Sequence, residues 1–285
     1  MSAYKLPEGN VKIAFSGGRT SGFMLHQILE ANGDLPERCK VIFANTGREM
    51  PETLDFVQEC SERWRVPITW LEYKNDDKGV GFNVVNHNSA SRDGEPFDNL
   101  IAKRRRLPNV FERFCTQEMK VLTMRRYLTK IDWKKWSSAI GIRIDEAHRA
   151  KQRPDSKETN FWPLINAKIT QNDVMEFWGK QRLAYNFDLR VTKGFGNCDG
   201  CFLKSEQTLA TLWRLHPEKA KWWASQEARV FEGNDPERQH LQTFKRRGSG
   251  GSSYAKLGEF VDRQGDWIFD DEAYLCQADD GECTG

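Results

Sequence analysis

The chain has 285 residues, 43 Lys and Arg against 41 Asp and Glu, and a polar mean hydropathy of −0.72. Seventeen Phe and ten Trp supply enough large apolar side chains to exclude a disordered chain. No apolar run reaches the roughly 20 residues of a membrane helix, and residues 1–10 lack the apolar core of a signal peptide. We therefore expect a cytoplasmic globular protein that makes no membrane contact.

Charge is distributed unevenly along the chain. Residues 103–153 hold fifteen Lys and Arg against five Asp and Glu, whereas residues 259–285 hold nine acids and one Arg. The basic segment could bind phosphate, sulfate or nucleic acid, and solvated helix faces would look the same. An oligomer is compatible with the composition.

The first part of the chain alternates strands and helices. Apolar runs predict strands at 11–15, 40–44 and 67–71. A glycine turn and then apolar residues at helical spacing follow the first strand, and Pro51 opens a helix after the second. This alternation with short loops predicts an α/β fold with a mostly parallel, doubly wound sheet.

The rest of the chain is less regular. Residues 73–112 are rich in Asn, Asp, Gly and Lys, which indicates an insertion or lid. A helix at 116–128, a strand near 137–142 and a helix at 172–182 resume the pattern. Residues 205–231 predict aromatic helices.

Three segments follow predicted strands and carry polar side chains. In Ser16–Ser21, Gly17 and Gly18 let backbone N–H groups close around an anion at a helix start, although a capped tight turn is the simpler alternative. Residues 45–53 follow the second strand, so Thr46 and Gly47 could face the same ligand. Residues 141–149 offer two arginines for phosphate or sulfate, with acids that could orient them, and an ordinary salt-bridge cluster would look similar.

The seven cysteines do not indicate a disulfide framework, because their number is odd and no export signal is present. Cys198 and Cys201 form a C-x-x-C pair that can hold zinc or two corners of an iron–sulfur cluster, with Cys115 and Cys276 or Cys283 completing the site. Free thiols or a redox dithiol are the alternatives. Two others, Cys39 and Cys60, fit the apolar core.

Together these segments resemble the phosphoadenosine-phosphosulfate (PAPS) reductase family of PP-loop proteins, over residues 11–204. The similar motifs are Ser16-Gly17-Gly18-Arg19-Thr20-Ser21, Asn45-Thr46-Gly47 with Pro51-Glu52-Thr53, Cys115-Thr116 with Lys120, Gly141 to Arg149, Phe161-Trp162-Pro163-Leu164, and Asn197 to Lys204. We accordingly expect a PP-loop nucleotide-binding domain over 1–190 and a helical, Cys-containing C-terminal region over 191–285.

The resemblance implies a Rossmann-like fold that binds an adenine nucleotide at its strand ends, near residues 16–21, Thr46, Gly47 and Gly141. It also implies a 4Fe–4S cluster on Cys115, Cys198, Cys201 and a further cysteine. We favour Cys276 for that ligand because apolar neighbours such as Trp267 and Phe269 could pack it down. Zinc is the alternative metal.

Two features depart from the family pattern. Thr20 stands where ATP-pyrophosphatase relatives carry an Mg²⁺-binding Asp, so ATP cleavage through Mg²⁺ at that position is not implied. Cys115 stands alone where cluster-bearing reductases show a Cys-Cys pair, and Glu282-Cys283-Thr284 only approximates their C-terminal E-C-G motif.

Three functions are compatible with this sequence. In a reductase, Cys283 attacks the sulfur of an adenylyl sulfate, Arg19, Arg143 and Arg149 neutralise the anion, and a thiol reductant protein frees sulfite. In a nucleic-acid thiolation enzyme, ATP activates the polymer, which the basic run 103–106 grips. A non-catalytic nucleotide-binding protein with structural zinc is the third.

Overall fold

The computed structural model describes residues 2–110, 112–152, 157–185, 194–232 and 253–264. Cys276, Cys283, most of the acidic segment 259–285 and the Gly-Ser segment at 248–253 (apart from Ser253) lie outside these ranges. Within them, no helix is both long and apolar enough to cross a bilayer.

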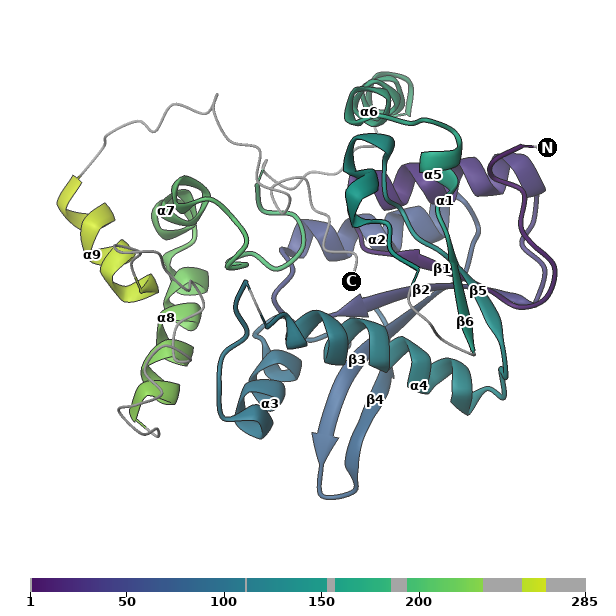
Figure 1. Ribbon diagram of the computed structural model, residues 1–285. Helices are drawn as coiled ribbons and strands as arrows, with labels where there is room; N and C mark the ends of the chain where they lie inside the picture. The colour runs from purple at the N-terminus through teal and green to yellow at the C-terminus, as the bar shows by residue number, and fades with distance from the viewer. Residues whose placement is uncertain (1, 111, 153–156, 186–193, 233–252, 265–285) are drawn as a thin grey trace.

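A six-stranded sheet in the order β4-β3-β2-β1-β5-β6 forms the centre of the molecule (Figure 1). All neighbouring strands are parallel except β3 and β4, which form an antiparallel hairpin. The strands are β1 (Val11–Phe15), β2 (Cys39–Asn45), β3 (Ile68–Asp76), β4 (Gly79–Val85), β5 (Trp136–Ala139) and β6 (Glu158–Phe161). The order runs outward from β1 in both directions, so the expected doubly wound, mostly parallel Rossmann-like sheet is confirmed.

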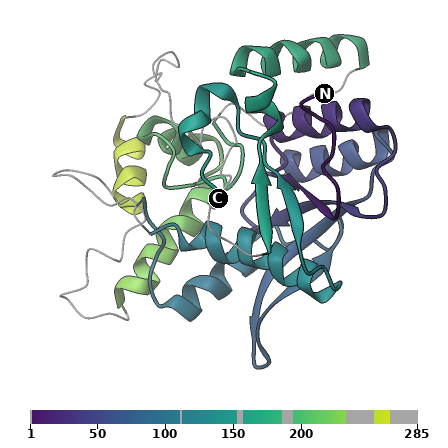
Figure 2. The ribbon, with the colours of Figure 1, turned by 45° about the vertical axis from the view of Figure 1, so that its right-hand side comes forward.

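Helices cover both faces of this sheet (Figures 1 and 2). The residues of β2 alternate between the two layers: Val41 and Phe43 join a core with α1 and α2, and Ile42 and Ala44 join a core with α4. A strand buried on both faces reads as a continuous apolar run, which is why this strand is visible in the sequence. The helices of these layers are α1 (Arg19–Asn32), α2 (Pro51–Arg63), α4 (Thr123–Lys130), α5 (Pro163–Asn166) and α6 (Gln171–Tyr185).

A second core lies beside the sheet, where the C-terminal helices pack. It joins α3 (Glu95–Arg104) to α7 (Glu206–Leu215), α8 (Pro217–Glu232) and α9 (Tyr254–Gln264) through buried residues such as Phe97, Trp223 and Tyr254. Segment 73–112 therefore supplies one edge of the sheet through β4 and one wall of this core through α3.

Several boundaries differ from the sequence analysis. The third strand continues to Asp76 instead of ending near residue 71, because its polar end pairs with β4 at the half-exposed edge of the sheet. The helix predicted at 116–128 begins as a π-helix, η1 (Thr116–Leu122), and continues as α4 to Lys130. The strand near 137–142 ends at Ala139, and the chain then leads into a 3₁₀-helix, η2 (Ile144–Arg149).

Candidate functional site

The loop Ser16–Ser21 joins the carboxyl end of β1 to the start of α1. The Ser21 hydroxyl closes this loop, because it accepts from the Ser16 N–H at 3.1 Å and donates to the Gly18 carbonyl at 3.0 Å. Gly18 is the N-cap and has no side chain to cap the helix, and the first turn contains no acid. The positive end of the helix dipole is thus not compensated by a local side chain, a condition that favours an anion.

The two glycines of this loop have different roles. Gly17 has a φ of +78°, and a Cβ there would lie 2.8 Å from Cγ2 of Thr53 on α2. Gly18 has a φ of −98° and a ψ of 166°, which any residue adopts. Gly17 is therefore required for the fold of the loop, whereas a side chain at Gly18 would occupy the space in front of the helix.

Arg143, which follows β5, reaches the same loop from the neighbouring strand. The sheet order reverses at β1, with β2 on one side and β5 on the other, and ligands of such sheets bind where these strand ends meet. After β5, Gly141 lies beside Ser21, and a Cβ on it would be in ordinary van der Waals contact with the Ser21 Cα at 3.5 Å. Arg143 is 2% exposed, and its Nη1 donates to Thr20 Oγ1 at 3.1 Å.

Two carboxylates of η2 orient the arginines. Asp145 accepts from Arg143 Nε and Nη2 at 3.1–3.2 Å, and Glu146 lies 3.4 Å from Arg143 Nη2 while also pairing with Arg149. The guanidinium of Arg143 next to Thr20 makes this position suitable for sulfate or phosphate oxygens.

The second loop, residues 45–50, lies against the thiols. The Thr46 hydroxyl donates to the Glu49 carboxylate at 2.9 Å and lies 3.3 Å from Cys198 Sγ. Glu49 and Cys198 also form a backbone bridge. Gly47, with a φ of +78°, is packed so tightly that a Cβ would lie 2.5 Å from Ser91 Oγ.

The three predicted ligand cysteines line one small cavity of about 20 Å³, together with Thr46, Lys120, Asn197 and apolar residues. Cys115 comes from the start of η1, and Cys198 and Cys201 come from the loop before α7. Cys39 and Cys60, in contrast, lie in the main core, as predicted. The structure thus places together thiols that are about eighty residues apart in the chain.

Burial has a strong effect on the Cys198 thiol. Desolvation raises the pKa of Cys198 far above its usual value, Glu49 adds to this rise, and Lys120 and the Thr46 hydrogen bond oppose it in part. The raised pKa means that the Cys198 thiol is protonated at neutral pH when no metal is bound. It must lose this proton to bind a metal, because only the thiolate ligates or reacts efficiently.

The donor set fits a thiolate-bound metal centre in composition. Three soft sulfur ligands suit an iron–sulfur cluster or zinc. Asn197, which is 3% exposed at a φ of +57°, lines the same cavity with both amide atoms lacking a hydrogen-bond partner among the described residues. No three His, Cys, Asp or Glu side chains of the described ranges already stand at metal-binding spacing. The thiols would therefore have to shift from their present positions to hold a metal centre.

Sequence reasoning missed a buried ion pair that holds the C-x-x-C loop. Arg48 Nη2 lies 2.8 Å from Asp199 Oδ2, with side chains 4% and 0% exposed, and its guanidinium stacks on Trp222 at 4.5 Å. Asp199 also accepts from Trp223 Nε1 at 2.7 Å. The one signal in the sequence is the Asp between the two cysteines. An Asp is almost never fully buried unless it is paired, so its position in a cysteine loop indicates a buried partner.

Comparisons with known proteins find several that are similar to this chain. A 28% identical relative is the "Uncharacterized nin region protein ORF290" of Escherichia phage lambda, which matches over 204 residues, 69% of this chain and 67% of that protein. A phosphoadenylyl-sulfate (PAPS) reductase from Candida auris, solved as a phosphate complex, matches with a TM-score of 0.41 and 16% identity over 65% of this chain and 82% of that chain. The U34-tRNA thiolase NcsA from Methanococcus maripaludis, solved with its [4Fe-4S] cluster, matches with a TM-score of 0.36 and 14% identity over 94% of this chain and 84% of that chain.

A family model gives the decisive match. The model of the phosphoadenosine phosphosulfate reductase domain covers residues 10–191, well over half of the chain. This range contains the sheet, the loop Ser16–Ser21 and the arginines of η2. The chain therefore belongs to the phosphoadenosine phosphosulfate reductase domain family.

Proposed function

We propose that this protein binds an adenine nucleotide at the carboxyl ends of β1 and β5. The observation that carries the proposal is the meeting of two anion-binding features at one place. The uncapped start of α1 follows β1, the strand at which the order of the sheet reverses. The buried Arg143 donates to Thr20 in the first turn of that helix. Backbone N–H groups and a guanidinium together suit a sulfate or phosphate group.

We further propose that Cys115, Cys198 and Cys201 hold a 4Fe–4S cluster, with Cys276 as the fourth ligand and zinc as the alternative metal. Support comes from the shared cavity and from the unpartnered amide of Asn197. When bound, the cluster would supply a polarisable inorganic group that tunes the electrostatics of the nucleotide site. Lys120 and Thr46, which oppose the raised pKa of Cys198, would favour its thiolate form.

The leading reaction is reduction of an activated sulfate. The Cys283 thiolate attacks the sulfur of an adenylyl sulfate, forming an S–S bond and breaking the bond from sulfur to the phosphate oxygen, so that the adenosine phosphate leaves. A thiol of an external reductant protein then attacks the Cys283 sulfur. Sulfite departs with the S–S electron pair, and the two thiol sulfurs become a disulfide. Arg143 and Arg149 stabilise the anionic groups during the first step.

A second candidate is ATP-dependent thiolation of a nucleic acid. A groove between the β3–β4 hairpin and α4, lined by Lys78, Arg125 and Lys130 among others, favours it, since a reductase of small nucleotides needs no polymer-binding surface. The two candidates share the nucleotide site and differ in what accepts the sulfur.

The test combines iron analysis with a sulfite-release assay on protein purified without oxygen. We expect a brown protein with about four iron and four sulfide per chain, and sulfite release from an adenylyl sulfate that needs Cys283. Cys276→Ser should lose iron and Cys283→Ser should keep it while losing turnover. A colourless protein with one stoichiometric zinc would refute the cluster, and full turnover in Cys283→Ser would refute the tail-thiol mechanism.

A further inference from the structure

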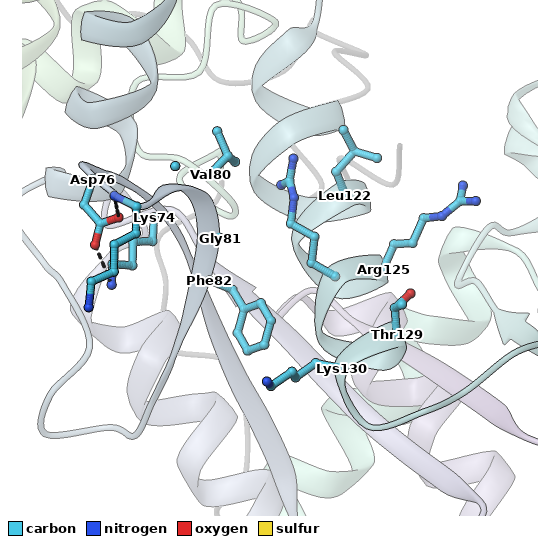
Figure 3. Close-up of a pocket in the computed structure, with 12 residues that line it drawn as sticks. Lys74, Asp76, Val80, Gly81, Phe82, Leu122, Arg125, Thr129 and Lys130 are labelled. Carbon is cyan, nitrogen blue, oxygen red and sulfur yellow. Dashed lines mark hydrogen bonds and ion pairs between the residues drawn. The ribbon is translucent and has the colours of Figure 1, made fainter.

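A large groove lies between the β3–β4 hairpin and α4, and it includes Leu122 at the end of η1 opposite to Cys115. Its volume is about 820 Å³. Phe82 and other apolar residues form part of its lining, and Lys130 of α4 extends toward Phe82 in Figure 3. Phe82 packs edge-on against Tyr127 at 5.7 Å, so the ring is held in place by the protein itself. We call this surface the basic groove.

The basic groove is strongly positive. Five cations and one acid line it: Lys74, Lys78, Arg125, Arg126, Lys130 and Asp76. Asp76 is engaged by Lys74 at 2.7 Å, and Arg126 lies 3.3 Å from Glu118. In the described part of the chain, Lys78 and Lys130 form no ion pair, and α4 itself contains no acid. The charge of Lys78 also acts on Asp76, but five cations against one acid leave a net positive charge on the two walls of this space.

The shape of this charge fits a polymer better than a small anion. The cations stand on opposite walls of a wide groove and do not converge on one point. Along α4, Arg125 to Lys130 spans about 7.5 Å at the rise of a helix, which corresponds to roughly two phosphates of one nucleic-acid strand. We propose that the basic groove binds nucleic acid through its phosphodiester backbone, without reading the bases.

This location differs from the basic run at 103–106 that the sequence singles out. Arg104 pairs with Glu118, and Arg106 pairs with Glu112 at 2.9 Å. Both guanidinium groups also lie over the ring of Phe114, at 5.7 and 5.4 Å. The charge of this run is largely used within the fold, whereas that of Lys78 and Lys130 is available to a ligand.

The groove is connected to the thiol cavity by one continuous helical segment. Cys115 precedes η1, Lys120 lies within it, and α4 continues from it to Lys130. At a helical rise, residues 115 to 130 span roughly 20 Å. A nucleic-acid strand bound in the groove could therefore follow this helix toward the cysteines. In the second candidate function, this strand would be the substrate that accepts sulfur. The binding proposal itself requires neither the cluster nor the nucleotide.

The test measures fluorescence anisotropy of labelled 20-nucleotide RNA, DNA and duplex DNA with the full chain, over a series of salt concentrations. We compare wild type with the double variant Lys78→Gln, Lys130→Gln. The matched control is Lys221→Gln, Lys256→Gln, which removes two exposed cations from α8 and α9. Comparing RNA, single-stranded DNA and duplex DNA shows which kind of nucleic acid the groove binds, since all three have a phosphodiester backbone.

We expect salt-dependent binding in which the groove variant lowers the slope of log K against log salt by about 0.7 per lost contact, or about 1.4 in total, for a single strand. The control should keep the wild-type slope. Equal slopes in all three proteins, an equal loss in both variants, or no binding at 50 mM salt would overturn the proposal. Displacement by polyglutamate as efficient as by nucleic acid would overturn it in favour of an acidic protein partner. Displacement by micromolar ATP would indicate a small-nucleotide site instead.

Discussion

Asp199 lies between the two cysteines of the C-x-x-C loop and is fully buried. Its carboxylate accepts hydrogen bonds from Arg48 Nη2 at 2.8 Å, from Trp223 Nε1 at 2.7 Å and from the N–H of Gly200 at 2.7 Å. Lys219 Nζ lies 3.6 Å from the same carboxylate. We expect Asp199→Ala to destabilise the protein strongly, because it leaves the Arg48 guanidinium buried without its carboxylate.

The magnitude follows from these contacts. Removing one partner of a buried ion pair costs about 3–5 kcal/mol, and each buried donor left without an acceptor costs about 1–3 kcal/mol. Even the lower end is a large part of the 5–15 kcal/mol by which a typical domain is stable. The double variant Arg48→Met, Asp199→Ala should lose less than Asp199→Ala alone, since the Arg48 guanidinium is then no longer buried without its carboxylate.

The assay is urea denaturation followed by tryptophan fluorescence, with the slope of the transition held as a check on two-state behaviour. The matched control is Asp98→Ala, whose ion pair with Arg229 at 2.9 Å joins side chains that are 39% and 44% exposed. That variant should lose less than about 1 kcal/mol. If Asp199→Ala costs no more than Asp98→Ala, the ion pair does not hold the cysteine loop and the reasoning is wrong.

Three further predictions concern other parts of the molecule. Cys198→Ser should abolish metal binding in an anaerobic metal assay and Cys39→Ser should retain it; equal metal content in both variants would contradict the thiol assignment. Burial raises the pKa of Glu158, but the charge of Lys12 at 2.6 Å and its hydrogen bonds outweigh this and hold the pKa below its usual value. Wild type should thus be more stable than Glu158→Gln at pH 7 and should lose this advantage as pH falls below about 4, in denaturant titrations across pH; a constant difference would refute it. Gly17→Ala should cost about 1–3 kcal/mol in thermal unfolding, because its left-handed backbone and the 2.8 Å approach to α2 exclude a Cβ; wild-type stability would contradict this.

The sequence was sufficient for the centre of the sheet and insufficient for its edges. β1 and β2 are covered on both faces, so they are apolar apart from Lys12 in β1 and the polar residues near the ends of β2, and their positions could be predicted. The polar end of β3, the half-exposed β4 and the short β6 (Glu158–Phe161) owe their strand conformation to pairing with neighbours, which composition does not reveal.

The site shows the same division. The loop Ser16–Ser21 is a local motif whose glycines and hydroxyls are adjacent in the chain, so its position could be predicted. The partner of Arg48 is 151 residues away and the contact of Arg143 with Thr20 spans 123 residues, so only the fold brings them together. The basic groove was hidden for the same reason, because two of its five cations come from a hairpin that the sequence presents as an irregular insertion.

Isothermal titration of the full chain with adenosine 5′-phosphosulfate, its 3′-phosphorylated form and ATP tests the nucleotide site most directly. The comparison includes Gly18→Val, Arg143→Gln and a control, Arg63→Gln, which removes a half-exposed charge on α2. We predict that wild type and the control bind an adenine nucleotide equally. Arg143→Gln should bind it about 10- to 100-fold more weakly, since a charged hydrogen bond contributes about 1.5–3 kcal/mol, and Gly18→Val should not bind although its backbone accepts valine. Equal affinity in all four proteins, or no binding of any of the three nucleotides by wild type, would contradict the assignment.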